Sequence, residues 1–234
     1  MNKVDNYWDE IYEKKLVFKT PLNRAIQREK YFYSFLRGKL KNKTLIDLGC
    51  GDSRQVIYYL NPVAEECFYI GMDNSKKSLK LTNQNENIAF VQFDINKLPV
   101  KKQSADIMFC FGLLMYFRNY EELLREMTSC VKPGGRIFFY ESIVNNTLRR
   151  NRNSHIDFKQ FVDILSNCGK ITFVKKDYSP IRTILICALD KLKLINLKWL
   201  MRFAIVCDII MINTIGKVNS FFDGRAVFIK WQKE

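Results

Sequence analysis

The sequence predicts an α/β domain built on a mostly parallel sheet of seven strands, with helices on both faces. Short apolar runs alternate with amphipathic stretches along the chain, the order that gives parallel strands joined by helices. The 234 residues suit one domain of ordinary size with room for an insertion. Apolar residues make up 47% of the chain and charged residues 26%, as in soluble globular proteins.

The predicted strands are, in chain order, seven short apolar runs: Thr44–Leu48, Cys67–Met72, Ile88–Phe93, Ile107–Phe111, Arg136–Tyr140, Lys170–Lys176 and Ala226–Trp231. Helices are predicted between them. The interval Tyr120–Val131 repeats apolar residues at helical spacing and ends at the turn Pro133-Gly134-Gly135. A second amphipathic run, Ile156–Asn167, follows a predicted N-cap at Ser154.

Two further segments accompany the core, which is predicted over residues 41–179 and completed by a final strand in 224–234. Residues 1–40 are predicted to form one or two amphipathic helices that cap the mouth of the sheet. Residues 180–223 are predicted to form a helical insertion, and charged residues interrupt each of its apolar runs before the roughly 20 residues of a membrane span. This insertion is predicted to be an acceptor cap, a membrane-surface element or a homodimer interface.

The chain is strongly basic, with a net charge of +14. Clustered Lys and Arg would favour nucleic acid or an anionic membrane, but here they are scattered, and an AT-rich coding bias is the alternative explanation.

The seven cysteines form no C-x-x-C pair and favour a reducing compartment; no metal site is predicted. The polar N-terminus shows no secretory signal. We expect a cytoplasmic protein, or one peripheral to the inner face of the membrane.

A buried strand that ends in a glycine turn is the strongest functional signal. Gly49 and Gly51 allow a tight turn and a close ligand, and the N-terminus of the following helix favours a carboxylate or phosphate. Asp73 ends the next predicted strand 22 residues after Gly51, a distance at which dinucleotide sites place a ribose-binding acid. A helix N-cap or a solvated strand end is the alternative for Asp73. Arg54 replaces the third glycine of the dehydrogenase fingerprint, which disfavours a nicotinamide cofactor.

With these motifs the sequence resembles the class I S-adenosylmethionine (SAM)-dependent methyltransferases, in their small-molecule branch. The resemblance covers about residues 40–140 and includes, in order, Asp47-Leu48-Gly49-Cys50-Gly51, Asp73, Phe90–Ile95, Ala105–Phe111 and Val131–Gly135. Tyr7-Trp8-Asp9 also resembles the aromatic-acid start of these enzymes. The resemblance implies a Rossmann-like sheet whose last strand is antiparallel. It also implies SAM as cofactor and S-adenosylhomocysteine as product.

The resemblance further implies which residues bind each part of the cofactor. A zwitterionic amino acid, a diol and a flat base need different partners, and all of these arise at the carboxyl ends of neighbouring strands. The implied contacts are Asp47 with Gly49, Cys50 and Gly51 for the methionine part, Asp73 for the ribose, Asp94 and the amide of Ile95 for the adenine, and Asn74 and Phe111 as pocket lining. An Asx turn before Asn96 is the alternative for Asp94.

Three residues are candidates for catalysis or for contact with the acceptor. His155, the sole histidine, could deprotonate a hydroxyl near neutral pH, and a surface or capping role is the alternative. Tyr116 lies just past the fourth strand, where the family often places acceptor contacts, and a packed loop tyrosine is the alternative. Glu141 ends the fifth strand and is the third candidate.

We therefore expect methyl transfer to a small-molecule acceptor, most simply a hydroxyl of a sugar, a lipid-linked glycan or a quinone-like metabolite. The first alternative is an RNA or protein methyltransferase that uses the basic charge. Against nucleic acid, Cys110-Phe111-Gly112-Leu113 lacks the Asn/Asp-Pro-Pro-aromatic run of base-nitrogen methyltransferases, and Cys110 does not precede a proline. The second alternative is a non-catalytic binding or assembly subunit with the same fold.

Overall fold

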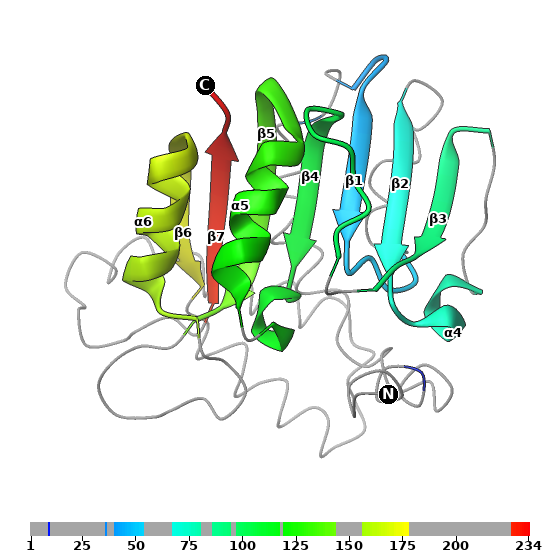
Figure 1. Cartoon of the computed structure of the whole chain (residues 1–234), viewed down its shortest axis with the longest axis horizontal. Helices are drawn as coiled ribbons and strands as arrows, with labels where there is room; N and C mark the ends of the chain where they lie inside the picture. Colours follow the sequence, from blue (N-terminus) through cyan, green and yellow to red (C-terminus); the bar gives the residue numbers. More distant parts are fainter. Residues whose placement is uncertain are drawn as a thin grey trace, which may run out of the picture.

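Seven strands form one mixed sheet in the computed structural model (Figure 1). The residues that the structure describes are Asp9, Leu36, 40–53, 67–80, 86–94, 97–117, 119–143, 156–177 and 226–234. The strands are β1 Thr44–Leu48, β2 Phe68–Asp73, β3 Ile88–Gln92, β4 Ala105–Phe111, β5 Val131–Ser142, β6 Lys170–Asp177 and β7 Ala226–Gln232.

The strand order is β3-β2-β1-β4-β5-β7-β6. The first five are parallel neighbours, whereas β7 pairs antiparallel with both β5 and β6. The predicted seven-stranded sheet with an antiparallel last strand is therefore confirmed. Because β1 has β2 on one side and β4 on the other, the strand order reverses at β1. Open α/β sheets bind ligands outside the carboxyl ends of the strands at such a reversal, here the lower edge in Figure 1.

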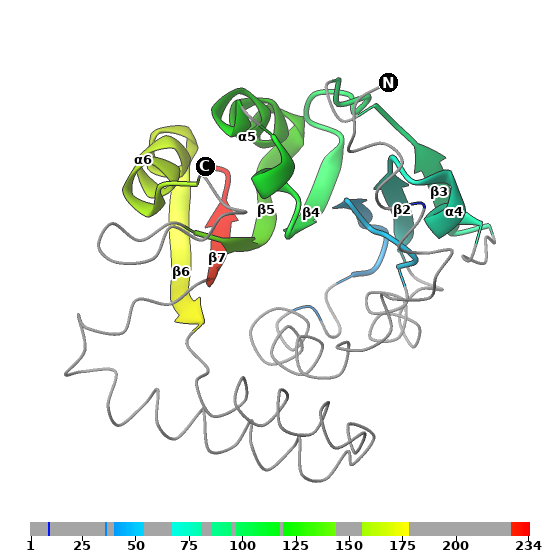
Figure 2. The same ribbon diagram turned by 90° about the horizontal axis from the view of Figure 1, so that it is seen from below.

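Helices α5 (Tyr120–Cys130) and α6 (Phe158–Cys168) lie side by side on one face of the sheet (Figure 2). The short helix α4 (Lys76–Leu79) follows β2, and the 3-10 turn η4 (Leu114–Tyr116) follows β4. The N-cap of α6 is Asp157, whose carboxylate accepts from the Gln160 amide at 2.9 Å. The predicted cap Ser154 lies outside the described residues.

The core divides into two apolar clusters because side chains alternate across the strands. Ile46 and Met108 point toward α5 and α6, and belong to the cluster that those helices close. Leu45 and Phe109 point the other way, into a cluster that includes Leu36 and Leu40 from the segment before the sheet. Apart from Asp9, Leu36 and Leu40, the predicted cap 1–40 lies outside the described residues, and so does the insertion 180–223. Within the described part of the chain, no helix is long and apolar enough to cross a membrane.

The segment Pro133-Gly134-Gly135 differs from its prediction as a separate turn. Helix α5 does end at Cys130, but β5 begins directly afterwards, and its pairing with β4 skips from Val131 to Arg136. Residues 132–135 therefore form a bulge within the strand. Gly134 has φ +73°, and Gly134 and Gly135 exchange backbone hydrogen bonds of 3.0 Å with Lys233 beyond β7. This pairing with the far end of the chain extends the strand past the point where the local sequence predicts a turn.

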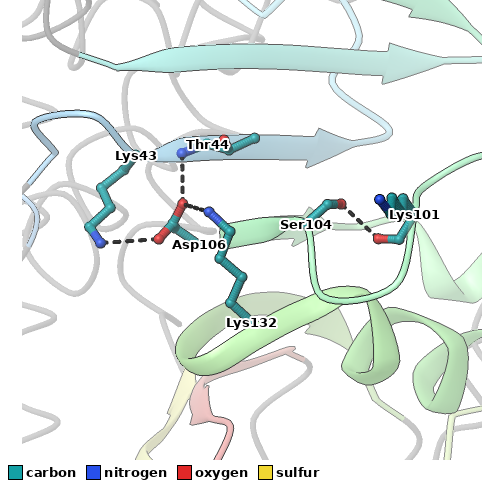
Figure 3. A network of polar contacts seen from close by, with 6 residues as sticks. All are labelled: Lys43, Thr44, Lys101, Ser104, Asp106 and Lys132. Atoms are coloured by element: carbon teal, nitrogen blue, oxygen red, sulfur yellow. Dashed lines mark hydrogen bonds and ion pairs between the residues drawn. The ribbon is translucent and has the colours of Figure 1, made fainter.

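The amino ends of β1 and β4 are joined at one carboxylate, that of Asp106 (Figure 3). Asp106 accepts from the Thr44 amide at 3.0 Å, from Lys43 Nζ at 3.0 Å and from Lys132 Nζ at 2.6 Å. Partial burial opposes the charge, but hydrogen bonds from Lys132, Thr44 and Lys43 outweigh it and lower the pKa of Asp106. This cluster lies at the edge of the sheet opposite to the carboxyl ends of the strands.

Lys233 caps the C-terminus of α5 from the far end of the chain. Its Nζ donates to the carbonyl oxygens of Thr128 at 3.2 Å, Ser129 at 3.5 Å and Val131 at 2.9 Å. The last carbonyls of a helix lack donors within the helix, and a cation there also interacts favourably with the helix dipole. We expect Lys233→Met, which keeps the aliphatic chain, to lower the free energy of unfolding by about 1 kcal/mol.

Urea unfolding of the purified variants measures this change. Lys101→Met is the matched control, because it removes the same charge from an exposed loop residue. A loss for Lys233→Met no greater than that for Lys101→Met would contradict the capping role.

Candidate functional site

The glycine loop lies directly after β1 and is tied to the end of β2. The amides of Gly49 and Cys50 both donate to the Met72 carbonyl, at 2.8 and 3.1 Å. Gly49 and Gly51 have φ values of +69° and +57°, a region in which a side chain is strained. A Cβ on Gly49 would also lie 2.9 Å from Leu113 Cδ1, so the residue type permits the loop after β4 to pack closely over it. Three strand ends therefore meet at this loop.

Asp73, at the end of β2, binds the loop through its carboxylate. Oδ2 accepts from the Gly51 amide at 2.8 Å, and Oδ1 accepts from the Ser75 amide at 2.8 Å. Burial raises the pKa of Asp73, and the hydrogen bonds from Ser75 and Gly51 offset part of that rise. An ionised carboxylate has about four acceptor positions, more than these two amides occupy.

Asp47 lies in the interior at the end of β1, with 3% of its surface exposed. The Tyr69 hydroxyl donates to Asp47 Oδ2 at 2.7 Å, and the same hydroxyl is hydrogen-bonded to Ser53 Oγ at 3.0 Å. Neither Tyr69 nor Ser53 is among the site residues predicted from the sequence. The register between β1 and β2, which the sequence does not show, places Tyr69 on the same face of the sheet as Asp47.

The predicted adenine contacts follow β3, the neighbour of β2. Asp94 is exposed, and its backbone carbonyl accepts from the Lys97 amide at 3.0 Å. It lies close to the end of β2, because the preceding Phe93 donates its amide to the Asp73 carbonyl at 3.2 Å. Asn74 is half-buried, and its carbonyl accepts from the Gln92 side chain at 3.0 Å. Ile95 lies outside the described residues.

Asp9 of the N-terminal segment also reaches this edge of the sheet. Ser75 Oγ donates to Asp9 Oδ1 at 2.5 Å, and the Lys77 amide donates to the same oxygen at 3.2 Å. Ser75 follows Asp73 by two residues, so Asp9 lies beside the predicted ribose site. The aromatic-acid start of the sequence thus has one described residue at the candidate site.

The residues at and after the end of β4 also lie beside the glycine loop. Phe111 is half-buried and packs against Phe109 with ring centroids 5.6 Å apart. Gly112 has φ +71°, and its amide donates to the Tyr140 carbonyl at 2.8 Å. Tyr116 is half-buried at the end of η4, two residues after the buried Leu114. The structure therefore places Phe111 and Tyr116 on the segment whose Leu113 covers Gly49.

Glu141 lies beneath this segment and is fully buried. Its Oε1 accepts from the Leu113 amide at 3.1 Å and from the Cys110 thiol at 3.4 Å, whereas Oε2 has no hydrogen-bond partner among the described residues. Burial, only partly offset by the Leu113 amide and the Cys110 thiol, raises the pKa of Glu141 to about 7. Glu141 thus contacts the loop after β4 from the interior. The other acid–base candidate, His155, lies outside the described residues.

The strand order and the glycine loop after β1 together define the class I SAM-dependent methyltransferase fold. The methyltransferase domain family matches residues 39–176, more than half of the chain. The chain belongs to this family.

Curated relatives and solved structures agree with this assignment. The chain is 27% identical over 125 residues to a ubiquinone biosynthesis O-methyltransferase of Bordetella pertussis, covering 51% of this chain and 48% of the relative. It is 27% identical over 110 residues to the human thiol S-methyltransferase TMT1A, covering 45% and 44%. The chain thus spans about half the length of the curated relatives it matches.

Two solved structures share the fold at low identity. Phosphoethanolamine N-methyltransferase 2 of Haemonchus contortus in complex with SAM has a TM-score of 0.66 at 14% identity, covering 91% of this chain and 52% of that one. Geranyl diphosphate C-methyltransferase of Streptomyces coelicolor, in complex with Mg²⁺, geranyl diphosphate and S-adenosylhomocysteine, has a TM-score of 0.65 at 13% identity, covering 96% and 84%. These names include transfers to nitrogen and carbon, besides the oxygen and sulfur of the sequence relatives.

Proposed function

We propose that this protein is a SAM-dependent methyltransferase that acts on a small-molecule acceptor. The observation that carries the proposal is the 2.8 Å hydrogen bond between the Gly51 amide and the Asp73 carboxylate. It joins the glycine loop to the acid of the next strand at the point where the sheet order reverses. Membership of the methyltransferase domain family supports the same function.

The charges at the site fit a cationic donor. Three acidic side chains, Asp47, Asp52 and Asp73, lie within or beside the glycine loop of an otherwise basic chain. SAM carries a sulfonium and an ammonium, so a buried or half-buried carboxylate near each compensates its charge. Gly51 has positive φ and no side chain, which lets a ligand approach the backbone closely at this position.

Different residues bind the different parts of the donor. Asp47, with the backbone of Gly49, Cys50 and Gly51, holds the methionine part, and Asp73 accepts from the ribose hydroxyls. The adenine lies against the segment after β3, with the remaining contacts from Asp94, Ile95, Asn74 and Phe111. The bound donor supplies an activated methyl group for displacement. The protein's task is to hold donor and acceptor in line at about 3–3.5 Å and to exclude water.

A hydroxyl of a sugar, lipid-linked or quinone-like metabolite is the acceptor that we propose. The relative from Bordetella pertussis is named for O-methylation in ubiquinone biosynthesis, which supports this choice. Residues 180–223 lie outside the family match and combine apolar runs with Lys and Arg, which suits a cap over an apolar acceptor. Tyr116 at the end of η4 is the proposed acceptor contact, and His155 is the proposed general base.

Asp73→Ala tests the donor site. Removing a carboxylate that accepts charge-assisted hydrogen bonds should weaken SAM binding by on the order of 1.5–3 kcal/mol, which is roughly a 10- to 150-fold rise in Kd. Isothermal titration with SAM measures the Kd. Asp106→Ala is the matched control, since it removes a hydrogen-bonded acid from the opposite edge of the sheet and should leave the Kd unchanged.

Two outcomes would count against the proposal. A wild-type protein that does not bind SAM at millimolar concentration overturns the function itself. Equal Kd values for wild type and a folded Asp73→Ala variant overturn the ribose assignment. For the acceptor, transfer of label from methyl-labelled SAM to quinol, sugar and thiol panels separates oxygen from sulfur acceptors.

A further inference from the structure

Three backbone amides of the glycine loop donate hydrogen bonds to the end of β2. Met72 accepts from two of its amides, and Asp73 accepts from a third. Ser53 is the last described residue of the segment that follows the glycines. It has φ +52° although it is not a glycine, and its amide donates to the Cys50 carbonyl at 2.9 Å. A residue in this strained region persists only where its surroundings hold it. The side-chain contact of Ser53 is therefore important to the shape of the loop.

That contact is the hydroxyl of Tyr69, which also binds Asp47. Asp47, Ser53 and Tyr69 are each 3% exposed, so water does not replace the hydrogen bonds between them. A phenolic hydroxyl has one proton, and a carboxylate can only accept, so the proton of Tyr69 lies toward Asp47. Burial and the charge of Asp47 raise the pKa of Tyr69, which keeps it a donor at physiological pH. The Tyr69 hydroxyl thus joins Asp47, which precedes the two glycines, to Ser53, which follows them.

The ring of Tyr69 is fixed independently of this hydroxyl. It packs edge-on against Phe90 with centroids 6.0 Å apart, inside the apolar cluster that contains Leu45 and Phe109. Parallel pairing places Tyr69 beside Leu45 and Asp47 beside Gly71, so Tyr69 and Asp47 are diagonal neighbours on one face. Because the backbone pairing and the ring packing set the position of the hydroxyl, it can determine the orientation of a carboxylate.

We propose that Tyr69 is a positioning residue of the donor site, whose hydroxyl orients the Asp47 carboxylate and the Ser53 end of the glycine loop for the amino-acid end of SAM. This inference rests on the proposed function. Tyr69 does not touch the donor; it acts through Asp47. A purely structural tyrosine would contribute to folding without distinguishing one part of the ligand from another.

Tyr69→Phe removes the hydroxyl and keeps the packed ring. Losing one hydrogen bond to a buried carboxylate should raise the Kd for S-adenosylhomocysteine about tenfold. The matched control is Tyr120→Phe, which removes a buried tyrosine hydroxyl bonded to Gln160 Oε1 at 2.6 Å between α5 and α6, and should change the Kd less than twofold. Titration calorimetry of the full chain measures both, with thermal melts to verify folding.

The second readout is 5′-methylthioadenosine, which lacks the amino-acid end. Tyr69→Phe should leave its Kd within twofold of wild type, because the Asp73 side of the site is unchanged. If Tyr69→Phe weakens both ligands equally, the residue is structural and the proposal is overturned; an unchanged Kd for S-adenosylhomocysteine overturns it too. If Tyr69→Phe does not fold, Ser53→Ala removes the other hydrogen bond of the same hydroxyl and is measured with the same two ligands. Weaker binding of S-adenosylhomocysteine alone supports the proposal, and no change or equal weakening of both ligands overturns it. Failure of the wild type to bind any of them contradicts the proposed function instead.

Discussion

Replacing Trp231 with alanine is expected to lower the free energy of unfolding by about 3–5 kcal/mol, as for other large buried aromatic residues. Trp231 is fully buried on β7, where it belongs to the apolar cluster closed by α6. Its Nε1 donates to the Leu165 carbonyl near the end of α6 at 2.9 Å. A Cβ on Gly169 would lie 2.6 Å from the indole, so strand, helix and turn are fitted around this ring.

Trp231→Phe separates packing from hydrogen bonding. Phenylalanine keeps much of the apolar surface but leaves the Leu165 carbonyl without its indole donor, at a cost of about 1–3 kcal/mol. Urea unfolding followed by circular dichroism measures both variants, with the m-value as a check that the transition stays two-state. If Trp231→Ala costs less than Trp231→Phe, the ring does not have the role that its burial indicates.

The strands could be predicted from the sequence because their signals are local. The prediction Thr44–Leu48 coincides with β1, whose four last residues are buried apolar or acidic side chains flanked by turns. Long-range pairing was not predictable in this way. The Pro133-Gly134-Gly135 segment has the local composition of a turn, yet it lies within β5 because Lys233, about a hundred residues later, pairs with it.

In the candidate site, too, local sequence signals were predictable and contacts between distant residues were not. The resemblance to the methyltransferase motifs implies that Asp47, Gly51 and Asp73 serve one ligand, and each of them lies at or just after the end of a strand that the sequence predicts. It does not predict that Tyr69 binds Asp47, because that contact depends on the register between β1 and β2. Nor does it show that Glu141 is buried, because burial arises only when the loop of Leu113 folds over the end of β5.

Glu141 is expected to make stability fall as the pH rises from about 4.5 to about 7. Its pKa is near its ordinary value of 4.5 in the unfolded chain and about 7 in the folded protein, so the folded state binds the proton more tightly. The stabilisation that comes from protonated Glu141 is therefore fully present below pH 4.5 and is lost as the pH rises through 7. Above that pH, Glu141 causes no further change in stability. At about 1.4 kcal/mol per pKa unit, the total is on the order of 3 kcal/mol.

Glu141→Gln isolates this effect, because glutamine keeps the shape and cannot titrate. The difference in free energy of unfolding between wild type and variant, measured by urea unfolding from pH 4 to 8, cancels the contributions of Asp73, Asp106 and other groups that are unchanged. We expect the free energy of unfolding of the wild type to fall relative to that of the variant as the pH rises. The midpoint of this change should lie at the pKa of Glu141 and not at that of Cys110, because burial raises the pKa of Cys110 well above its ordinary value. A pH-independent difference would mean that Glu141 titrates normally in the folded protein. In that case the carboxylate beneath the Leu113 loop is charged at neutral pH.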